Sequence, residues 1–295
     1  MKNLFWLLFL FPLTSHAVLW EMFQYPDDNT TYTNADSDYR IYNAPSTHGS
    51  GRYALTFDDG PHPTNTAKIL DHLKINNVRV AFFVTTSQIT EANSYLIKRM
   101  LDEGHLVGSH GRNHDNSNQV TKAVWKARVK QSFVDLNKWY KKAGHKFDKF
   151  YYRFPYAAYG KRSDHHHFNT LKEISRELMG ENCIQFAFWD QDSGDWIPGM
   201  TSSEVFNNLK ATNEGGRFIT YKTVKRPNGT STQVKVHTQM NNPTSGGVVL
   251  QHDIQESSVN GTALFLNYAA QKNISIVRLD EVEEFAVTKN CQMKE

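Results

Sequence analysis

Short apolar segments typical of buried strands alternate with segments of helical periodicity along most of this 295-residue chain. The strand-like segments lie at residues 53–57, 80–84, 106–108, 150–152, 184–189, 248–250 and 274–277. The helix-like segments lie at about residues 64–73, 95–101, 121–143, 168–179, 202–212 and 260–271. Repetition of strand, loop and helix predicts a parallel sheet covered by helices. At this length it favours an α/β barrel of seven or eight units over an open sheet.

The repeat of strands and helices is interrupted at residues 217–240, where the residue pattern alternates as in a pair of antiparallel strands. Pro227-Asn228-Gly229 at its centre is a strong hairpin turn signal. We therefore expect a β-hairpin inserted into one barrel domain that covers residues 51–285. Residues 18–50 are polar and form an expected N-terminal arm, and residues 286–295 form a polar C-terminal tail.

The first 17 residues have the pattern of a secretory signal peptide. Lys2 precedes an apolar run at residues 4–13, and small residues follow at Ser15 and Ala17. The run is too short to span a bilayer, so we predict cleavage near Ala17. An uncleaved anchor and a buried first strand are the alternatives. We expect a secreted or periplasmic monomer that is not inserted in the membrane after cleavage.

Composition excludes one large class of partners and leaves the cysteines open. The 33 Lys and Arg residues oppose 30 Asp and Glu residues, a formal net charge of +3. Nucleic-acid-binding proteins usually show a strong basic excess, so we expect no nucleic-acid partner. Hydrophobic residues make up 39% of the chain, which is enough to build a core. Cys183 and Cys291 can pair in an oxidising compartment, but two separate buried thiols fit the sequence equally well.

Two adjacent carboxylates, Asp58 and Asp59, follow the first strand in the segment Thr-Phe-Asp-Asp-Gly-Pro at residues 56–61. In parallel barrels the carboxyl ends of the strands build the active site. Adjacent side chains point in different directions, so one carboxylate can bind a metal while its neighbour serves as a base. A solvated turn is the alternative interpretation.

The third strand is followed by His110 and His114, which are four residues apart. On one face of a helical turn, two such imidazoles can hold a single divalent ion. Together with one carboxylate they would leave open positions for water and substrate, which suits a Lewis-acid hydrolase. The chain has 13 histidines, so a chance pair is the alternative, and we interpret residues 165–167 as a polar loop.

Three further strand ends carry polar or aromatic side chains. Arg153 could hold a carboxylate by a two-pronged salt bridge, and the backbone at Tyr156 could present an N–H to an oxyanion. Residues 190–196 crowd carboxylates beside an aromatic ring after the fifth strand, and His252 ends a late strand. Taken singly, an ordinary turn, an acidic surface loop and a structural histidine are the alternatives.

These five motifs, in this order and at strand ends, resemble those of the polysaccharide deacetylase family (carbohydrate esterase family 4, the NodB-homology group). The resemblance covers about residues 50 to 280, and the motifs at 56–61 and 110–114 are quite specific in combination. The family has a distorted (β/α) barrel. It removes N- or O-acetyl groups from sugars with a divalent metal, usually zinc.

The resemblance implies a role for each matching residue. Asp58 would be the general base, oriented by Arg153, and Asp59 would hold the metal with His110 and His114. We expect Zn²⁺ there, although Co²⁺ and Mn²⁺ can use the same ligands. A metal and a carboxylate together can deprotonate water near neutral pH.

The remaining matches would complete the reaction. The backbone N–H of Tyr156 would help to bind the oxyanion. Asp195 would support His252 as the general acid that protonates the leaving amine. The residues expected to form the substrate pocket around the acetyl methyl are Trp196, Leu250 and Pro155.

Two positions depart from the family pattern. Gly111 stands where Ser or Thr usually follows the first metal-binding histidine, and Phe154 replaces the commoner proline. We expect a supporting hydrogen bond to come from elsewhere. No catalytic group is lost, so an active enzyme is expected.

The expected substrate is an N-acetylated glycan polymer, first peptidoglycan, whose N-acetylglucosamine or N-acetylmuramic acid would lose acetate. Chitin or chito-oligosaccharide is the second candidate, and an acetyl-xylan esterase is the third. Other classes remain as alternatives: a secreted carbohydrate-binding protein on an inactive barrel, and a metal-dependent phosphoesterase. The retention of all the matching Asp, His and Arg residues favours the enzyme, and the scarcity of basic residues near the motifs disfavours the phosphoesterase.

Overall fold

The structure is a computed structural model that describes residues 44–159, 167–226, 228–287 and 290–294. The predicted signal peptide and residues 18–43 of the predicted arm lie outside the described residues. No helix within the described ranges is long and apolar enough to cross a membrane.

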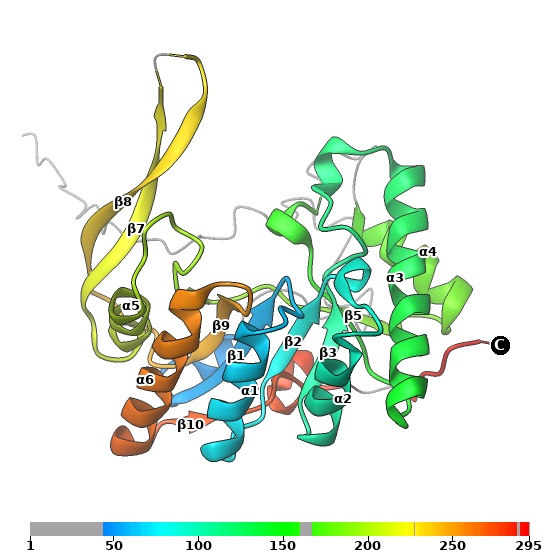
Figure 1. Cartoon of the computed structure of the whole chain (residues 1–295), viewed down its shortest axis with the longest axis horizontal. Coiled ribbons are helices and arrows are strands. Elements are labelled where there is room, and N and C mark those ends of the chain that lie inside the picture. Colours follow the sequence, from blue (N-terminus) through cyan, green and yellow to red (C-terminus); the bar gives the residue numbers. More distant parts are fainter. Residues whose placement is uncertain (1–43, 160–166, 227, 288–289, 295) are drawn as a thin grey trace, which may run out of the picture.

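The centre of the molecule is a curled parallel sheet (Figure 1). Its strands follow the order β5-β4-β3-β2-β1-β9-β6, and β10 pairs with β1. Their bounds are β1 Arg52–Asp58, β2 Ala81–Val84, β3 Leu106–Ser109, β4 Phe150–Tyr152, β5 Ile184–Phe186, β6 Gln191–Asp192, β9 Gly247–His252 and β10 Ser275–Ile276. Among the described residues no ladder joins the edge strands β5 and β6, so the barrel is open on that side. The sheet confirms the expected α/β barrel type, distorted as in NodB-homology proteins.

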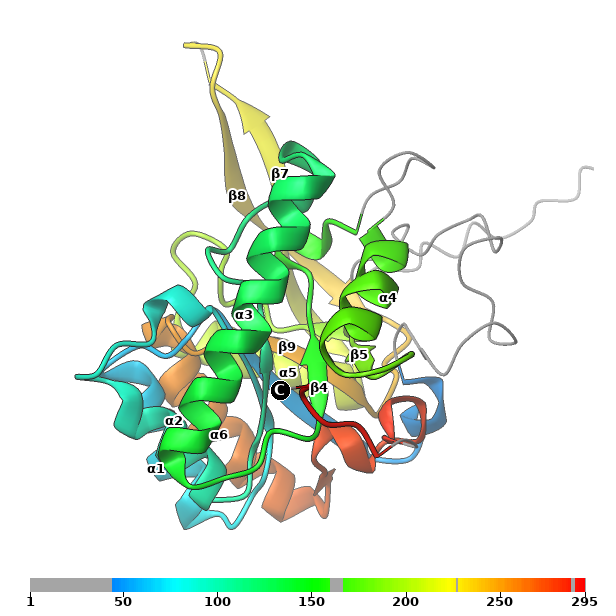
Figure 2. The same cartoon turned by 90° about the vertical axis from the view of Figure 1, so that its right-hand side faces the viewer.

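In the described residues, six helices pack around the sheet (Figures 1 and 2). Their bounds are α1 Asn65–Ile75, α2 Ser94–Asp102, α3 Lys122–Ala143, α4 His167–Leu178, α5 Ser202–Glu214 and α6 Glu256–Lys272. Local sequence explains their ends. The Thr121 side chain accepts a hydrogen bond from the Val124 N–H at the start of α3, and Gly144 ends that helix with φ of 84°. Thr201 and Glu204 form a capping box at the start of α5. Short 3₁₀ helices are η1 Pro45–Thr47, η2 Thr86–Gln88, η3 Ser117–Gln119, η4 Pro155–Ala157, η5 Leu279–Glu281 and η6 Glu283–Phe285.

The central strands are continuous apolar runs in the sequence because both of their faces lie in the core. All four residues of β2 are buried, as are residues 53–58 of β1, because helices and side chains cover both faces of the sheet. The register of β1 against β9 places Asp58 beside His252. The two motifs separated by almost 200 residues therefore meet at the carboxyl ends of adjacent strands.

Part of the predicted fifth strand is not a strand. β5 ends at Phe186, and a separate two-residue strand, β6, pairs with β9 instead. The chain therefore crosses the opening of the barrel between residues 187 and 190, and the motif at 190–196 starts on the far edge of the sheet. The apolar pattern could not show this break, because residues 187–189 are buried in either arrangement.

The unit that interrupts the α/β repeat is an antiparallel hairpin of β7 Gly216–Lys225 and β8 Ser231–Met240. Its strands pair without interruption from Gly216↔Met240 to Lys225↔Ser231. It projects away from the body of the molecule as a twisted ribbon (Figures 1 and 2).

The two cysteines form a disulfide bond, a point that the sequence left open. Cys183 and Cys291 have an S–S distance of 2.08 Å and a Cα–Cα distance of 5.9 Å, within the usual geometric range. The bond ties the C-terminal tail to the segment that precedes β5.

Candidate active site

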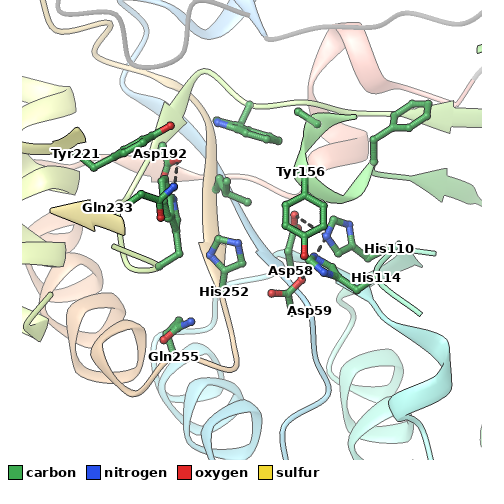
Figure 3. Close-up of a pocket in the computed structure, with 15 residues that line it drawn as sticks. Asp58, Asp59, His110, His114, Tyr156, Asp192, Tyr221, Gln233, His252 and Gln255 are labelled. Carbon is green, nitrogen blue, oxygen red and sulfur yellow. Dashed lines mark hydrogen bonds and ion pairs between the residues drawn. The ribbon is translucent and has the colours of Figure 1, made fainter. Parts of the chain in front are cut away.

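A cavity of about 300 Å³ opens at the carboxyl ends of β1 and β9 (Figure 3). Eight of the predicted site residues line it: Asp58, Asp59, His110, His114, Tyr156, Trp196, Leu250 and His252. Arg153 and Asp195 lie behind this lining and are almost fully buried. Pro155 is not among the lining residues, and its neighbours Phe154 and Ala157 are.

Asp59, His110 and His114 form a compact group on one side of the cavity. The Oδ1 atom of Asp59 lies 3.3 Å from Nε2 of His110 and 3.1 Å from Nε2 of His114. The expectation that a helical turn aligns the two histidines is wrong. Gly111 has φ of 78° and His114 has φ of 57°, values that interrupt a right-handed helix, so a loop brings the two imidazoles together.

This group fits a divalent metal ion. The Nδ1 atom of His110 lies 2.9 Å from the carbonyl oxygen of Arg153, which can only accept, so Nδ1 carries a proton. In the neutral imidazole, Nε2 then presents a lone pair to Asp59 Oδ1. That oxygen is buried and accepts no hydrogen bond from any described residue. Facing lone pairs are stabilised by a cation between them, and two imidazoles with one carboxylate suit Zn²⁺, Co²⁺ or Mn²⁺.

The electrostatics of Asp59 favour its ionised form. Burial alone would raise its pKa, but hydrogen bonds and attraction from the imidazolium forms of His110 and His114 outweigh burial and hold the pKa well below its usual range. A metal ion would take the place of those imidazole protons, because carboxylate and imidazole ligands bind metal in their deprotonated forms.

Asp58 is held from behind by a buried arginine. Nη1 of Arg153 donates to Asp58 Oδ1 at 2.9 Å and to the Thr56 hydroxyl at 2.6 Å. The other guanidinium donors reach the carbonyl oxygens of Ala187 and Phe188, each at 2.9 Å. The expected two-pronged salt bridge is therefore wrong, because only one nitrogen of Arg153 is left for the carboxylate. Asp58 Oδ2 lies 3.8 Å from His110 Nε2, so its second oxygen faces the metal-ligand group.

His252 lies across the cavity and is paired with a buried carboxylate. Its Nδ1 lies 2.7 Å from Oδ1 of Asp195, and its backbone N–H donates to Oδ2 of Asp195 at 2.6 Å. The Ser258 hydroxyl also donates to that carboxylate. Burial alone would lower the pKa of His252, but Asp195 outweighs burial and raises it to about 10. The imidazole is therefore protonated at neutral pH.

Tyr156 lies in η4 with φ of 58°, a left-handed conformation that is costly for a bulky residue. Its ring is 62% exposed and lies 4.6 Å from the ring of His114. Backbone strain of this kind is found mostly at functional sites, where it orients a backbone group or a side chain.

The polysaccharide deacetylase family model matches residues 46–170 of the chain. A peptidoglycan-N-acetylglucosamine deacetylase of Bacillus cereus is 30% identical over 161 residues, which cover 54% of this chain and 68% of that protein. The chain belongs to the polysaccharide deacetylase family.

Other members are similar over a greater part of this chain. The peptidoglycan-N-acetylglucosamine deacetylase PgdA of Listeria monocytogenes is 29% identical over 253 residues, 83% of this chain. The match spans only 42% of the length of that relative. The crystal structure of a chitin deacetylase from Colletotrichum lindemuthianum matches 83% of this chain and 91% of its own, with 25% identity and a TM-score of 0.55. A peptidoglycan N-acetylglucosamine deacetylase structure with 23% identity and a TM-score of 0.57 shows the same fold.

Both departures from the family pattern have a structural explanation. The Gly111 N–H donates to the Ser109 hydroxyl at 3.0 Å, so a neighbouring serine supplies a hydrogen bond that supports the loop. The Phe154 side chain is buried and stacks on Trp125, with ring centroids 5.8 Å apart. In this member of the family, aromatic packing takes the place of the proline.

Seven lining residues were not among the site residues predicted from the sequence: Phe154, Ala157, Trp189, Asp192, Tyr221, Gln233 and Gln255. Asp192 accepts hydrogen bonds from the Trp196 indole at 3.0 Å, and burial raises its pKa to about 6. Asp192 belongs to the 190–196 motif identified in the sequence, so its place in that motif could have predicted that it lines the cavity. Tyr221 and Gln233 come from the hairpin, and no local pattern indicates which side of a hairpin faces a distant cavity.

Proposed function

We propose that this protein is an exported, metal-dependent deacetylase that hydrolyses the N-acetyl group of peptidoglycan sugars, N-acetylglucosamine or N-acetylmuramic acid, and releases acetate. One observation carries the proposal: a metal-ligand triad and an oriented carboxylate lie opposite a carboxylate-bound imidazolium in one cavity. The similarity to Listeria and Bacillus proteins named as peptidoglycan deacetylases supports this choice of polymer.

Asp59, His110 and His114 would hold the ion, and we propose Zn²⁺. The ion would supply Lewis-acid chemistry, polarising the acetyl carbonyl and lowering the pKa of a nearby water. Asp58 would take one proton from the attacking water as the water oxygen bonds to the acetyl carbon. The hydrogen bond from Arg153 fixes the orientation of that carboxylate.

The oxyanion formed by this attack would accept a hydrogen bond from the backbone N–H of Tyr156, which the left-handed turn of η4 orients. His252 would then donate a proton to the sugar nitrogen as the carbon–nitrogen bond breaks. The products are acetate and a free amino sugar. Trp196 and Leu250 line the cavity where the small acetyl methyl would be selected.

The site of action follows from the substrate. Peptidoglycan lies outside the cytoplasmic membrane, and the signal peptide predicted to be cleaved near Ala17 agrees with secretion or a periplasmic location. We propose that the enzyme works there as a monomer.

Chitin is the second candidate substrate. A chitin deacetylase of Colletotrichum lindemuthianum is 44% identical over 77 residues, which cover 25% of this chain. The two candidates differ in the polymer and share the chemistry, so one assay separates them.

The test is acetate release by the zinc-loaded protein from purified peptidoglycan and from chitohexaose, measured side by side. Asp58→Asn keeps the side-chain size and removes the base, so we expect its rate to fall by roughly 10²- to 10⁴-fold. Asp71→Asn, at a carboxylate of α1 that is 62% exposed, is the matched control and should retain the wild-type rate.

Faster release from peptidoglycan supports the proposal, and release from chitohexaose alone replaces it by the second candidate. No release from either polymer by protein with bound zinc overturns the deacetylase assignment for these glycans.

A further inference from the structure

The hairpin of β7 and β8 forms part of the wall of the catalytic cavity. Tyr221 of β7 and Gln233 of β8 line the same cavity as Asp58 and His252 (Figure 3). In Figure 3 these two side chains lie on the side of His252 that is opposite to Tyr156 and the metal-ligand group. The hairpin therefore borders the side of the cavity that lies beyond His252.

The base of the hairpin is firmly attached. Asn208 of α5 is fully buried, donates to the carbonyl oxygens of Ser193 and Ile219, and accepts from the Ile219 N–H at 2.8 Å. Lys235 donates to the Gly199 carbonyl at 2.7 Å. The Tyr221 ring packs edge-on against Trp196, with centroids 4.8 Å apart. These contacts hold the cavity-facing side of the hairpin in place.

The register of the hairpin shows which residues share that side. Thr223 lies opposite Gln233, and Lys225 lies opposite Ser231. Residues two apart on a strand point to the same face, so Tyr221, Gln233 and Lys225 lie on one face. Lys225 is four residues beyond Tyr221, about 13 Å farther from the base. Lys222 points to the opposite face.

The charge of the hairpin is of one sign. Residues 216–240 include five Lys and Arg residues and no Asp or Glu. Lys235 is paired with Glu204 of α5, whereas within the described part of the chain Lys222, Lys225 and Arg226 have no acidic partner. The lysines of α3 differ, because Lys126 pairs with both Glu173 and Glu177 of α4.

We propose that the cavity-facing side of this hairpin selects an anionic glycan. Tyr221 would pack against a sugar next to the acetylated one, Gln233 would hydrogen-bond to its polar groups, and Lys225 would bind a carboxylate carried by the polymer. Peptidoglycan carries such carboxylates on its peptide stems, and chitin carries none. This inference rests on the proposed deacetylase function. It adds that the hairpin would recognise the carboxylates of the substrate.

The test compares Lys225→Gln with Lys222→Gln, two neutralised lysines of one hairpin on opposite faces. The measured quantity is the ratio of kcat/KM for peptidoglycan to kcat/KM for chitohexaose. We expect this ratio to fall about threefold in Lys225→Gln, through KM, and to stay at the wild-type value in Lys222→Gln. The difference should shrink at high salt and on peptidoglycan whose carboxylates have been converted to amides.

An equal fall in both variants, or no fall in either, overturns the inference. Persistence of the Lys225→Gln effect on peptidoglycan whose carboxylates have been converted to amides also overturns it.

Failure of the proposed function would look different. If the wild-type protein releases no acetate from any glycan, cosedimentation of the zinc-loaded variants with peptidoglycan tests the hairpin alone. Weaker cosedimentation of Lys225→Gln than of Lys222→Gln would then support the inference, and equal cosedimentation would overturn it.

Discussion

A histidine lies at the end of a strand at each end of the sheet, and the pKa values of these two histidines move in opposite directions. At the carboxyl end, Asp195 raises the pKa of His252 to about 10. At the amino end, burial lowers the pKa of His105 to about 4, and repulsion from Arg278, Arg99 and Arg79 adds to the fall. His105 accepts a hydrogen bond from the Val80 N–H at 3.1 Å, a role that needs the neutral imidazole.

The two ends of the barrel stabilise their polar side chains in different ways. The carboxyl end keeps charged groups buried by giving each one a partner, as Arg153 does for Asp58 and Asp195 does for His252. The amino end keeps its histidine uncharged and uses it as a backbone acceptor. The first arrangement would prepare the proton transfer proposed above, and the second joins β2 to β3. Variants that break these partnerships should therefore affect activity at one end and stability at the other.

The largest expected effect is on the rate, in Asp195→Asn. Without the carboxylate, the pKa of His252 should fall from about 10 toward its ordinary value of about 6.5. At pH 9 only about one molecule in 300 would then keep the proton that His252 is proposed to donate, so kcat at that pH should drop by roughly two orders of magnitude. The alkaline limb of the pH–rate profile should also move to lower pH. A lower rate with an unmoved alkaline limb would contradict the role assigned to this pair.

The next largest effect is on stability, in Arg153→Met. This change leaves the Asp58 carboxylate buried without its charged partner, which typically costs about 3 to 5 kcal/mol. Urea denaturation measures it. Arg79→Met is the matched control at the amino end, because Arg79 is 52% exposed in its ion pair with Glu281 and should cost less than about 1 kcal/mol. Equal costs for the two variants would show that burial does not distinguish the two ends.

A smaller effect is the loss of stability in acid caused by His105. Its folded-state pKa of about 4 lies below the unfolded value of about 6.5, so the unfolded chain binds the proton first as the pH falls. The stabilisation is complete above about pH 6.5, and about 3 kcal/mol is lost as the pH falls toward 4. His105→Asn, which keeps an acceptor for the Val80 N–H, should flatten this part of the curve of unfolding free energy against pH. An unchanged curve would mean that groups other than His105 cause the loss of stability at low pH.

Much of the architecture could be predicted because it depends on local patterns. The six helices were predicted from apolar periodicity, and their ends fit local capping chemistry such as the Thr201 capping box. The strands buried on both faces were visible as apolar runs. The five motifs at strand ends predicted which side chains meet, because parallel strands bring their carboxyl ends to one edge.

Other features could not be predicted because they depend on distant contacts. Two left-handed residues, Gly111 and His114, replaced the expected helical turn. The donors of Arg153 are shared with two backbone carbonyls, which a pattern of residue types does not reveal. The break between β5 and β6 arises where the barrel opens, and the buried pattern continues through it.

The sequence by itself determined the α/β repeat, the family motifs and the metal ligands, because periodicity and side-chain chemistry are local properties. Only the tertiary structure decided that Cys183 bonds to Cys291 and that Tyr221 lines the same cavity as Asp58. Those facts depend on which segments the folded chain brings together. Packing of the whole core selects these pairs, and no local stretch of sequence carries that information.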